Sequence, residues 1–224
     1  MIKDSRYFAV KEVIIRGAEI ELSYLKGRNI FDIDLRKESK RIVTAYPVYK
    51  MVKLIRLFPD RLFADFAKRT PYACVKLYRT FVVDDEGVFF DYVAPQEIQG
   101  LPIITGLETK IFGPRPGIVS GNKELHLAIT IIKAFKNNKI LKRFRITRID
   151  MFNLQSVSIF IDKLYSPGFA ANGVEIKIWP NTNAEKLRVL GGLLKFYGDK
   201  LDDIKYIDLR FKDPVIKFKD AKSS

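Results

Sequence analysis

Carboxylates in one short run are the first side chains in this sequence that could do chemistry. Asp84-Asp85-Glu86 could bind a divalent cation if further oxygen ligands lay close to it. No other ligand follows nearby in the sequence, and Gly87 suits the positive φ of a hairpin loop between Phe81–Val83 and Val88–Phe90. We therefore interpret the run as a solvated turn and predict no metal site.

The single histidine and the single cysteine also lack catalytic partners in the sequence. His126 lies off the apolar stripe of a predicted helix, and a catalytic imidazole needs an orienting group and a nucleophile. Cys74 is predicted to be a small buried strand residue, and one cysteine excludes an intrachain disulfide. The loop Gly113–Gly121 lacks the Gly-Lys-Ser/Thr ending of a phosphate-binding loop. With H-E-x-x-H, G-x-S-x-G and G-x-G-x-x-G also absent, we predict no catalytic residue, no cofactor and no enzyme.

The charge of the chain indicates an attraction to anionic partners or surfaces. The 224 residues carry a formal net charge of +14. Residues 1–70 hold 16 lysines and arginines against 9 acidic residues, and residues 71–224 hold 24 against 17. Because a nucleic-acid-binding arm or tail would concentrate this charge, we favour general solubility and attraction to an anionic surface.

Neither a membrane span nor a signal peptide is visible in the sequence. No run of 18 or more apolar residues occurs, and Met1–Tyr7 has no apolar core of a signal peptide. We therefore expect any segment that anchors or exports the native protein to lie outside this sequence.

The first 70 residues have the pattern of a small α/β sandwich in the order β-α-α-β-β. The main support for this interpretation is the segment Val52–Ala73. Apolar and polar side chains alternate on both sides of Phe58-Pro59-Asp60-Arg61, and the run ends at Thr70-Pro71. The preceding elements are a strand in Tyr7–Arg16, a short helix in Glu19–Leu25 that ends before Gly27, and a helix that starts at the N-cap Asp34 and ends before Pro47.

The remaining residues predict a larger domain with several strands and two helices. The helices are Glu124–Asn137 and a segment from the capping box Thr182–Glu185 to Gly198; the strands include Phe144–Ile149, Val157–Ile161 and Val174–Ile178, an antiparallel meander. A final hairpin joins Ile207–Phe211 to Val215–Phe218 through Asp213-Pro214, and its last strand is a candidate sheet edge. The fold class is α+β, with domains at 7–70 and 71–219 and a charged tail at 220–224.

The order of these elements resembles the extracytoplasmic part of the bacterial division protein family FtsQ/DivIB. In that family a POTRA domain of order β-α-α-β-β precedes a strand-rich domain. The similar segments are Val13–Gly17, Ile30–Leu35, Tyr46-Pro47, Phe58–Leu62, Arg69–Ala73, Val83–Gly87, Leu101–Gly106 and Tyr206–Phe211. The chain departs from the family at Lys68, where a glutamate is usual, and at Asp213-Pro214, which replaces a glycine-containing turn.

The resemblance implies a non-catalytic scaffold of the divisome at the periplasmic face of the membrane, with a single-pass anchor. It implies binding of small bitopic partners of the FtsB/DivIC and FtsL type, and through them control of septal peptidoglycan synthesis. The implied mode is addition of a partner strand to the last strand of the sheet. The candidate partner-binding residues are Phe211, Val215, Ile216, Lys217 and Phe218.

Two other interpretations remain open at this stage. A POTRA-like unit could serve polypeptide binding in outer-membrane secretion or barrel assembly, although no second copy and no barrel-length strands are visible. The charge and the 12% aromatic content could also serve nucleic-acid binding, which would weaken steeply with salt.

Overall fold

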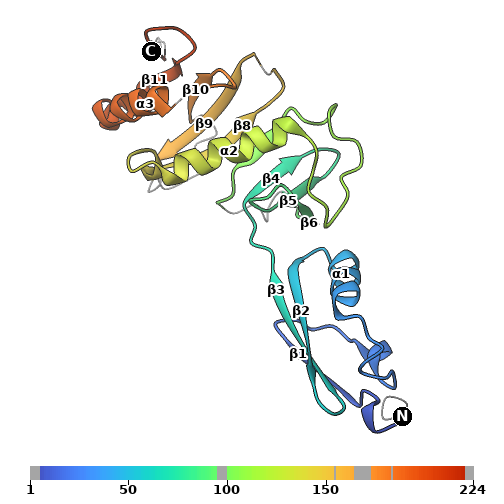
Figure 1. Cartoon of the computed structure of the whole chain (residues 1–224). Coiled ribbons are helices and arrows are strands. Elements are labelled where there is room, and N and C mark those ends of the chain that lie inside the picture. Colours follow the sequence, from blue (N-terminus) through green and yellow to red (C-terminus); the bar gives the residue numbers. More distant parts are fainter. Residues whose placement is uncertain (1–5, 95–99, 154, 164–172, 183, 220–224) are drawn as a thin grey trace. The chain divides into compact units, whose positions relative to one another are not determined.

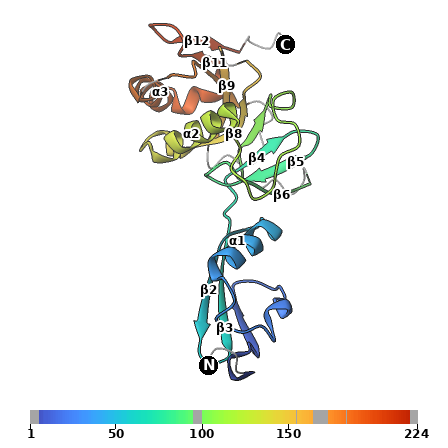
Figure 2. The same cartoon turned by 45° about the vertical axis from the view of Figure 1, so that its right-hand side comes forward.

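The protein has an α+β fold with three α-helices and two β-sheets in its described residues (Figures 1 and 2). A computed structural model describes residues 6–94, 100–153, 155–163, 173–182 and 184–219. The predicted fold class is confirmed.

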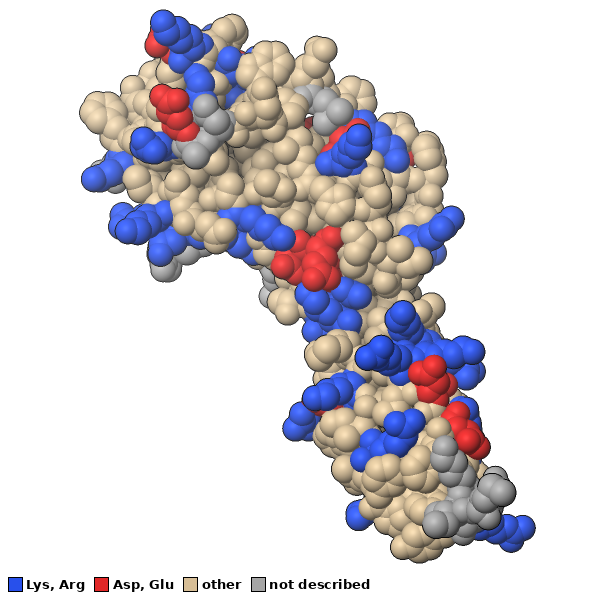
Figure 3. All heavy atoms as spheres, in the orientation of Figure 1, with Lys and Arg blue, Asp and Glu red and all other residues tan. Residues whose placement is uncertain are grey.

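The chain divides into two compact units. Unit 1 consists of residues 1–70, 88–91 and 115–118, and unit 2 consists of residues 71–87, 92–114 and 119–224. This division passes between Thr70 and Pro71. The domain limits at 7–70 and 71–219 stay a prediction, and the tail at 220–224 lies outside the described residues. Lysine and arginine side chains lie on the surface of both units, as Figure 3 shows for one face.

Unit 1 contains a three-stranded sheet in the order β1-β3-β2. β2 (Tyr49–Leu57) pairs antiparallel with β3 (Arg61–Lys68), and β3 pairs parallel with β1 (Glu12–Arg16). The predicted alternation is confirmed, because Val52 and Leu54 are buried on β2 while Lys53 between them is exposed. The peptide bond Phe58–Pro59 in the connecting turn is cis.

One helix of unit 1 forms as predicted. α1 (Leu35–Ala45) begins at Asp34, whose carboxylate accepts hydrogen bonds from the amides of Arg36 and Lys37 at 3.0 and 3.1 Å. These bonds hold the pKa of Asp34 below its usual value, because the amides stabilise the charged carboxylate. Ile42 on this helix belongs to the buried core of unit 1.

The predicted helix at Glu19–Leu25 is wrong in length. Only the 3₁₀ helix η3 (Ser23–Leu25) forms there. Leu22 and Leu25 are both buried in the core of unit 1, and 3₁₀ geometry places residues three apart on one face. The helix does not continue beyond Leu25, because Gly27 has φ +79° and donates its amide to the Val10 carbonyl.

The strands of unit 2 belong to a nine-stranded sheet in the order β12-β11-β10-β9-β8-β7-β4-β5-β6. Its strands are β4 (Ala73–Lys76), β5 (Thr80–Val83), β6 (Phe89–Tyr92), β7 (Ile103–Thr105), β8 (Phe144–Asp150), β9 (Val157–Lys163), β10 (Val174–Ile178), β11 (Ile204–Asp208) and β12 (Val215–Phe218). The predicted meander is confirmed, since β8, β9 and β10 are antiparallel neighbours.

The sheet also contains parallel pairs where a helix connects two neighbouring strands. α2 (Lys123–Asn137) lies between β7 and β8 in sequence, and α3 (Ala184–Phe196) lies between β10 and β11. Both strand pairs are parallel. Both connections step in the same direction along the sheet, so right-handed crossovers place both helices on one face, as Figures 1 and 2 show.

Apolar side chains of these helices meet the buried face of the sheet. α2 begins at Asn122, whose side chain accepts a hydrogen bond from the Leu125 amide at 2.8 Å, and it buries Leu125, Ala128, Ile129, Ile131, Ile132 and Phe135. On α3, Leu190 and Leu194 are fully buried. None of the helices in the described part of the chain is long and apolar enough to cross a bilayer.

The start of α3 is described only in part. Thr182 Oγ1 donates to the Trp179 carbonyl at 2.6 Å. The predicted capping box includes residue 183, which lies outside the described residues.

Candidate protein-docking edge

β12 forms one end of the large sheet and pairs with β11 alone among the described strands. The pairing is antiparallel and sets Ile216 opposite Ile207, Lys217 opposite Tyr206 and Val215 opposite Asp208. An edge strand directs half of its main-chain donors and acceptors away from its neighbour. The predicted edge position of the last strand is therefore confirmed in the described structure.

Two hydrogen bonds determine which main-chain groups face outward. The Lys219 amide donates to the Asp203 carbonyl at 2.7 Å, toward β11, and the Leu209 amide donates to the Lys177 carbonyl at 2.9 Å, toward β10. Because direction alternates along a strand, the main-chain groups of Lys217 point toward β11 and those of Ile216 and its next-but-one neighbour Phe218 point away. The open ladder positions of β12 are Ile216 and Phe218.

Side chains of β12 also alternate between the two faces of the sheet. Ile216 and Phe218 lie opposite Ile207 and Ile204, which are both fully buried. The Phe218 ring lies edge-on to the Tyr197 ring just after α3, with centroids 6.0 Å apart, yet 45% of Phe218 remains exposed. The helix-covered face of the edge strand is thus apolar and half open.

Polar side chains characterise the opposite face of the same edge. Lys217 is exposed opposite Tyr206, whose ring lies 4.6 Å from Lys177 Nζ. Ser158 Oγ donates to Glu175 at 2.6 Å farther into the sheet. A segment added to β12 would therefore meet an apolar row on one face and a polar row on the other.

The structure does not place Phe211 on a strand. β11 ends at Asp208, so Phe211 lies in the turn before β12 with 56% of its surface exposed. Of the predicted site residues, Val215, Ile216, Lys217 and Phe218 share β12, and Phe211 is separated from them by the rest of the turn. The predicted alternation through Phe211 was wrong beyond Asp208.

An ion pair explains why the strand ends there. Arg210 donates its own amide to Asp208 Oδ1 at 3.0 Å, and its guanidinium binds both carboxylate oxygens at 2.9 and 2.6 Å. Arg210 Nη1 also donates to Ser156 Oγ at 2.9 Å. Burial opposes ionisation of Asp208, but the bonds from Arg210 outweigh it and lower the pKa of this carboxyl.

Two further long-range contacts hold the turn. Lys186 Nζ of α3 donates to the carbonyls of Phe211 and Lys212, the latter at 2.9 Å. Trp179 Nε1 donates to the Arg210 carbonyl at 2.9 Å. The turn is thereby tied to α3 and to the end of β10, so β12 presents a preorganised edge.

The other candidate groups of the sequence have structural roles. Asp84 is buried and accepts the Glu86 amide at 2.9 Å, so this residue of the acidic run stabilises the turn rather than facing solvent. No group of three metal-binding side chains occurs within the described ranges. His126 is half-buried with Nε2 2.5 Å from the Ser120 carbonyl, and Cys74 is buried on β4. The surface prediction for His126 was therefore only partly right.

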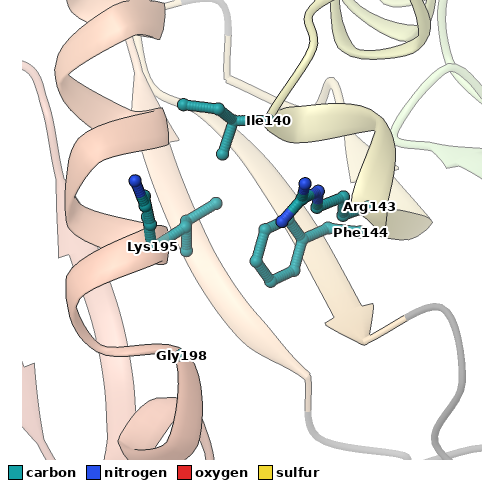
Figure 4. A pocket seen from close by; sticks show the side chains of 6 residues that line it. Ile140, Arg143, Phe144, Lys195 and Gly198 are labelled. Atoms are coloured by element: carbon teal, nitrogen blue, oxygen red, sulfur yellow. The ribbon is translucent and has the colours of Figure 1, made fainter.

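A hollow of about 270 Å³ lies where α3 approaches the start of β8 (Figure 4). The lining residues are Ile140, Arg143, Phe144, Leu194, Lys195 and Gly198. These residues provide no carboxylate, hydroxyl, thiol or imidazole, and their ionisable side chains are Arg143 and Lys195.

Comparison with known proteins gives relatives of one kind. The chain is 24% identical over 187 residues to the cell division protein FtsQ of Myxococcus fulvus and 26% identical over 197 residues to that of a Geobacter species, covering 82% and 85% of this chain. It is 23% identical over 233 residues to FtsQ of Syntrophotalea carbinolica, covering 99% of this chain and 77% of the relative. No protein-family model matches the chain.

The chain spans only part of these relatives, 61% of the first and 65% of the second. It has an α+β fold with a small three-stranded, POTRA-like unit and a large mixed sheet that ends at β12 in the described residues. Together with these features, relatives of the same name along nearly the whole chain make it similar to the cell division proteins named FtsQ.

Proposed function

We propose that this protein is a non-catalytic scaffold of the divisome that binds small bitopic division proteins through its edge strand β12. The partners are of the FtsB/DivIC and FtsL type, and their capture helps to control septal peptidoglycan synthesis. The protein acts on the periplasmic side of the membrane, held by a single-pass anchor outside this sequence. The observation that supports this proposal is the outward direction of the Ile216 and Phe218 main chain on a preorganised edge.

Strand addition explains how such an edge selects a partner. Main-chain bonds at Ile216 and Phe218 supply affinity without regard to sequence, while the apolar row on one face and Lys217 on the other select the partner's side chains. Phe211 contributes at the rim from the turn. The exposed cation of Lys217 favours a partner strand with acidic residues opposite it.

Phe218→Glu tests the proposed site. The substitution puts a carboxylate on the apolar row, at a side chain 45% exposed in the free protein, so the fold tolerates it while a docked strand would bury it. We expect binding of the cognate FtsB/DivIC-type ectodomain, measured by titration calorimetry, to weaken by about tenfold or more.

Phe112→Glu is the matched control, because Phe112 is 83% exposed in unit 2 and lies outside β12. It should leave the affinity unchanged. Circular dichroism establishes that both variants are folded. If Phe218→Glu binds the ectodomain as tightly as the unsubstituted protein, strand addition at β12 is excluded.

A further inference from the structure

Four aromatic rings form a continuous chain at one end of unit 1, and we call them the aromatic tip: Tyr7, Phe8, Phe31 and Phe58. Successive ring centroids lie 5.2, 5.1 and 5.3 Å apart. The rings come from three segments that are distant in sequence. Figures 1 and 2 show the first of these segments and the β2–β3 turn at the same end of the unit.

Much of the aromatic tip is open to solvent. Tyr7 is 61% exposed, Phe58 57% and Phe31 38%, and Leu57 beside Phe58 is 37% exposed. Single exposed apolar side chains are ordinary, but a contiguous group of large ones marks an interaction surface. Phe8 also packs against the core of unit 1, whereas Tyr7, Phe31 and Phe58 are exposed and lie outside that core.

Main-chain bonds hold the three segments of the tip together. The Ile30 amide donates to the Phe8 carbonyl at 2.9 Å, and the Lys11 amide donates to the Asp60 carbonyl at 2.8 Å. Arg56 on β2 reaches across and donates to the carbonyls of Ile30 and Ile33 at 2.9 and 2.7 Å. The aromatic rings are therefore presented on a fixed backbone.

The segments that form the aromatic tip contain more basic than acidic residues. Segments 6–11, 26–33 and 56–61 contain the basic residues Arg6, Lys11, Lys26, Arg28, Arg56 and Arg61 and the acidic residues Asp32 and Asp60. Two neighbouring carboxylates offset part of this charge: Glu12 lies opposite Arg61 in the sheet, and Glu38 lies 3.8 Å from Arg28. Asp60 is paired with Lys11 at 2.7 Å, which lowers the pKa of this carboxyl through the hydrogen bond from the lysine. The local excess of cations thus complements an anionic surface.

We propose that the aromatic tip seats unit 1 on the surface of an anionic lipid bilayer. Exposed aromatic rings insert at the depth of the headgroups, and the surrounding lysines and arginines approach the lipid phosphates and anionic headgroups. The proposal goes beyond strand addition, because it concerns unit 1 and needs neither β12 nor a protein partner.

Vesicle co-sedimentation of the whole chain tests this proposal. Vesicles of phosphatidylglycerol mixed with phosphatidylcholine should bind the protein, and vesicles of phosphatidylcholine alone should bind it weakly. The double variant Phe31→Ser/Phe58→Ser should reduce the partition coefficient on the anionic vesicles by about tenfold or more, since it removes two apolar rings from the contact.

The matched control is Phe112→Ser/Phe152→Ser, which removes two rings that are 83% and 75% exposed in unit 2. It should bind vesicles like the unsubstituted protein. The proposal is overturned if the unsubstituted protein does not bind anionic vesicles, or if the control loses as much binding as Phe31→Ser/Phe58→Ser.

Sedimentation velocity without lipid tests the alternative that a second copy of the chain covers the aromatic tip. Dimerisation that Phe31→Ser/Phe58→Ser abolishes, without vesicle binding, would assign the aromatic tip to a second copy of the chain and also overturn the proposal. Partner binding at β12 is measured in a separate assay, so failure of either proposal is recognised independently of the other.

Discussion

Ile216 lies directly opposite Ile207 in the antiparallel pair of β12 and β11, and its main-chain groups point away from that pair. Ile207 is fully buried, and Ile216 is half-buried. One residue therefore contributes its side chain to the edge of the core and its backbone to the open ladder. The neighbouring Lys217 has the reverse arrangement, with an exposed side chain and a backbone directed toward β11.

Proline substitutions at these two neighbours should have opposite effects. Ile216→Pro should be as stable as Ile216→Ala, because its missing amide is the outward one, while partner binding should be weaker than in Ile216→Ala. Lys217→Pro should be less stable than Lys217→Ala by about 1 kcal/mol or more, because it removes a bond to β11. Urea unfolding gives the stabilities. The reverse order of stability losses would show that the deduced backbone direction is wrong.

The pair Asp208–Arg210 should stabilise the turn in a pH-dependent manner. Arg210→Gln leaves a buried carboxylate without its guanidinium and should cost about 2 kcal/mol near pH 7. Since the folded-state pKa of Asp208 is lowered from 3.8, the pair stabilises the fold above about that pH, and its contribution is lost as the pH falls through the folded pKa.

Urea unfolding of Arg210→Gln at several pH values checks this expectation. The stability difference from the unsubstituted protein should be constant from pH 7 to about 5 and shrink below about pH 4. Lys212→Gln, which removes an exposed cation of the same turn, is the control and should show no such pH dependence. A deficit of Arg210→Gln that stays constant down to about pH 2 would contradict the role of Asp208 ionisation.

Local patterns predicted most of the elements around the candidate site. The alternation of Val52 and Leu54 with Lys53 indicated the buried face of β2, and the carboxylate of Asp34 marked the start of α1. Val215–Phe218 was predicted as a strand because apolar and β-branched residues follow the Asp213-Pro214 break, and it was assigned as a sheet edge because it is the last strand of the pattern.

Long-range contacts explain the parts that the sequence did not reveal. Phe211 was assigned to a strand by its alternation with Leu209, but Lys186 and Trp179 hold the turn carbonyls from α3 and from the residue after β10. The backbone direction at Ile216 likewise depends on the register with β11. The same alternation of side chains is compatible with either set of alternate amides facing outward. No local pattern carries that information.

The thiol of Cys74 should be unreactive in the folded protein. Cys74 is fully buried on β4, and burial raises the pKa of its thiol to about 11, so the thiolate is scarce at ordinary pH. Ellman's reagent at about pH 8 should label it only as fast as the protein unfolds, and completely in guanidinium chloride. Rapid labelling of the native protein would contradict the strand position of Cys74.

Gly106 should be intolerant of a side chain for a reason separate from its backbone angle. It has φ +79°, and a Cβ there would lie 2.2 Å from the Phe152 amide nitrogen and 2.9 Å from Asp150 Oδ1, two atoms that are hydrogen-bonded to each other. Gly113 in the same unit has φ +65° and nothing within 4 Å of the corresponding position. The two glycines therefore share the backbone requirement and differ in the close approach.

Alanine at each position separates the two effects. Gly113→Ala should cost about 1–2 kcal/mol from its left-handed backbone alone. Gly106→Ala should cost about 1–3 kcal/mol more, because the Cβ forces the Phe152 backbone away from the end of β8. Chemical unfolding monitored by circular dichroism gives both values. Equal losses of unfolding free energy in the two variants would mean that the segment after β8 shifts to accept the Cβ without cost. The close packing of Gly106 against Phe152 would then contribute nothing to the stability of the β7–β8 pair.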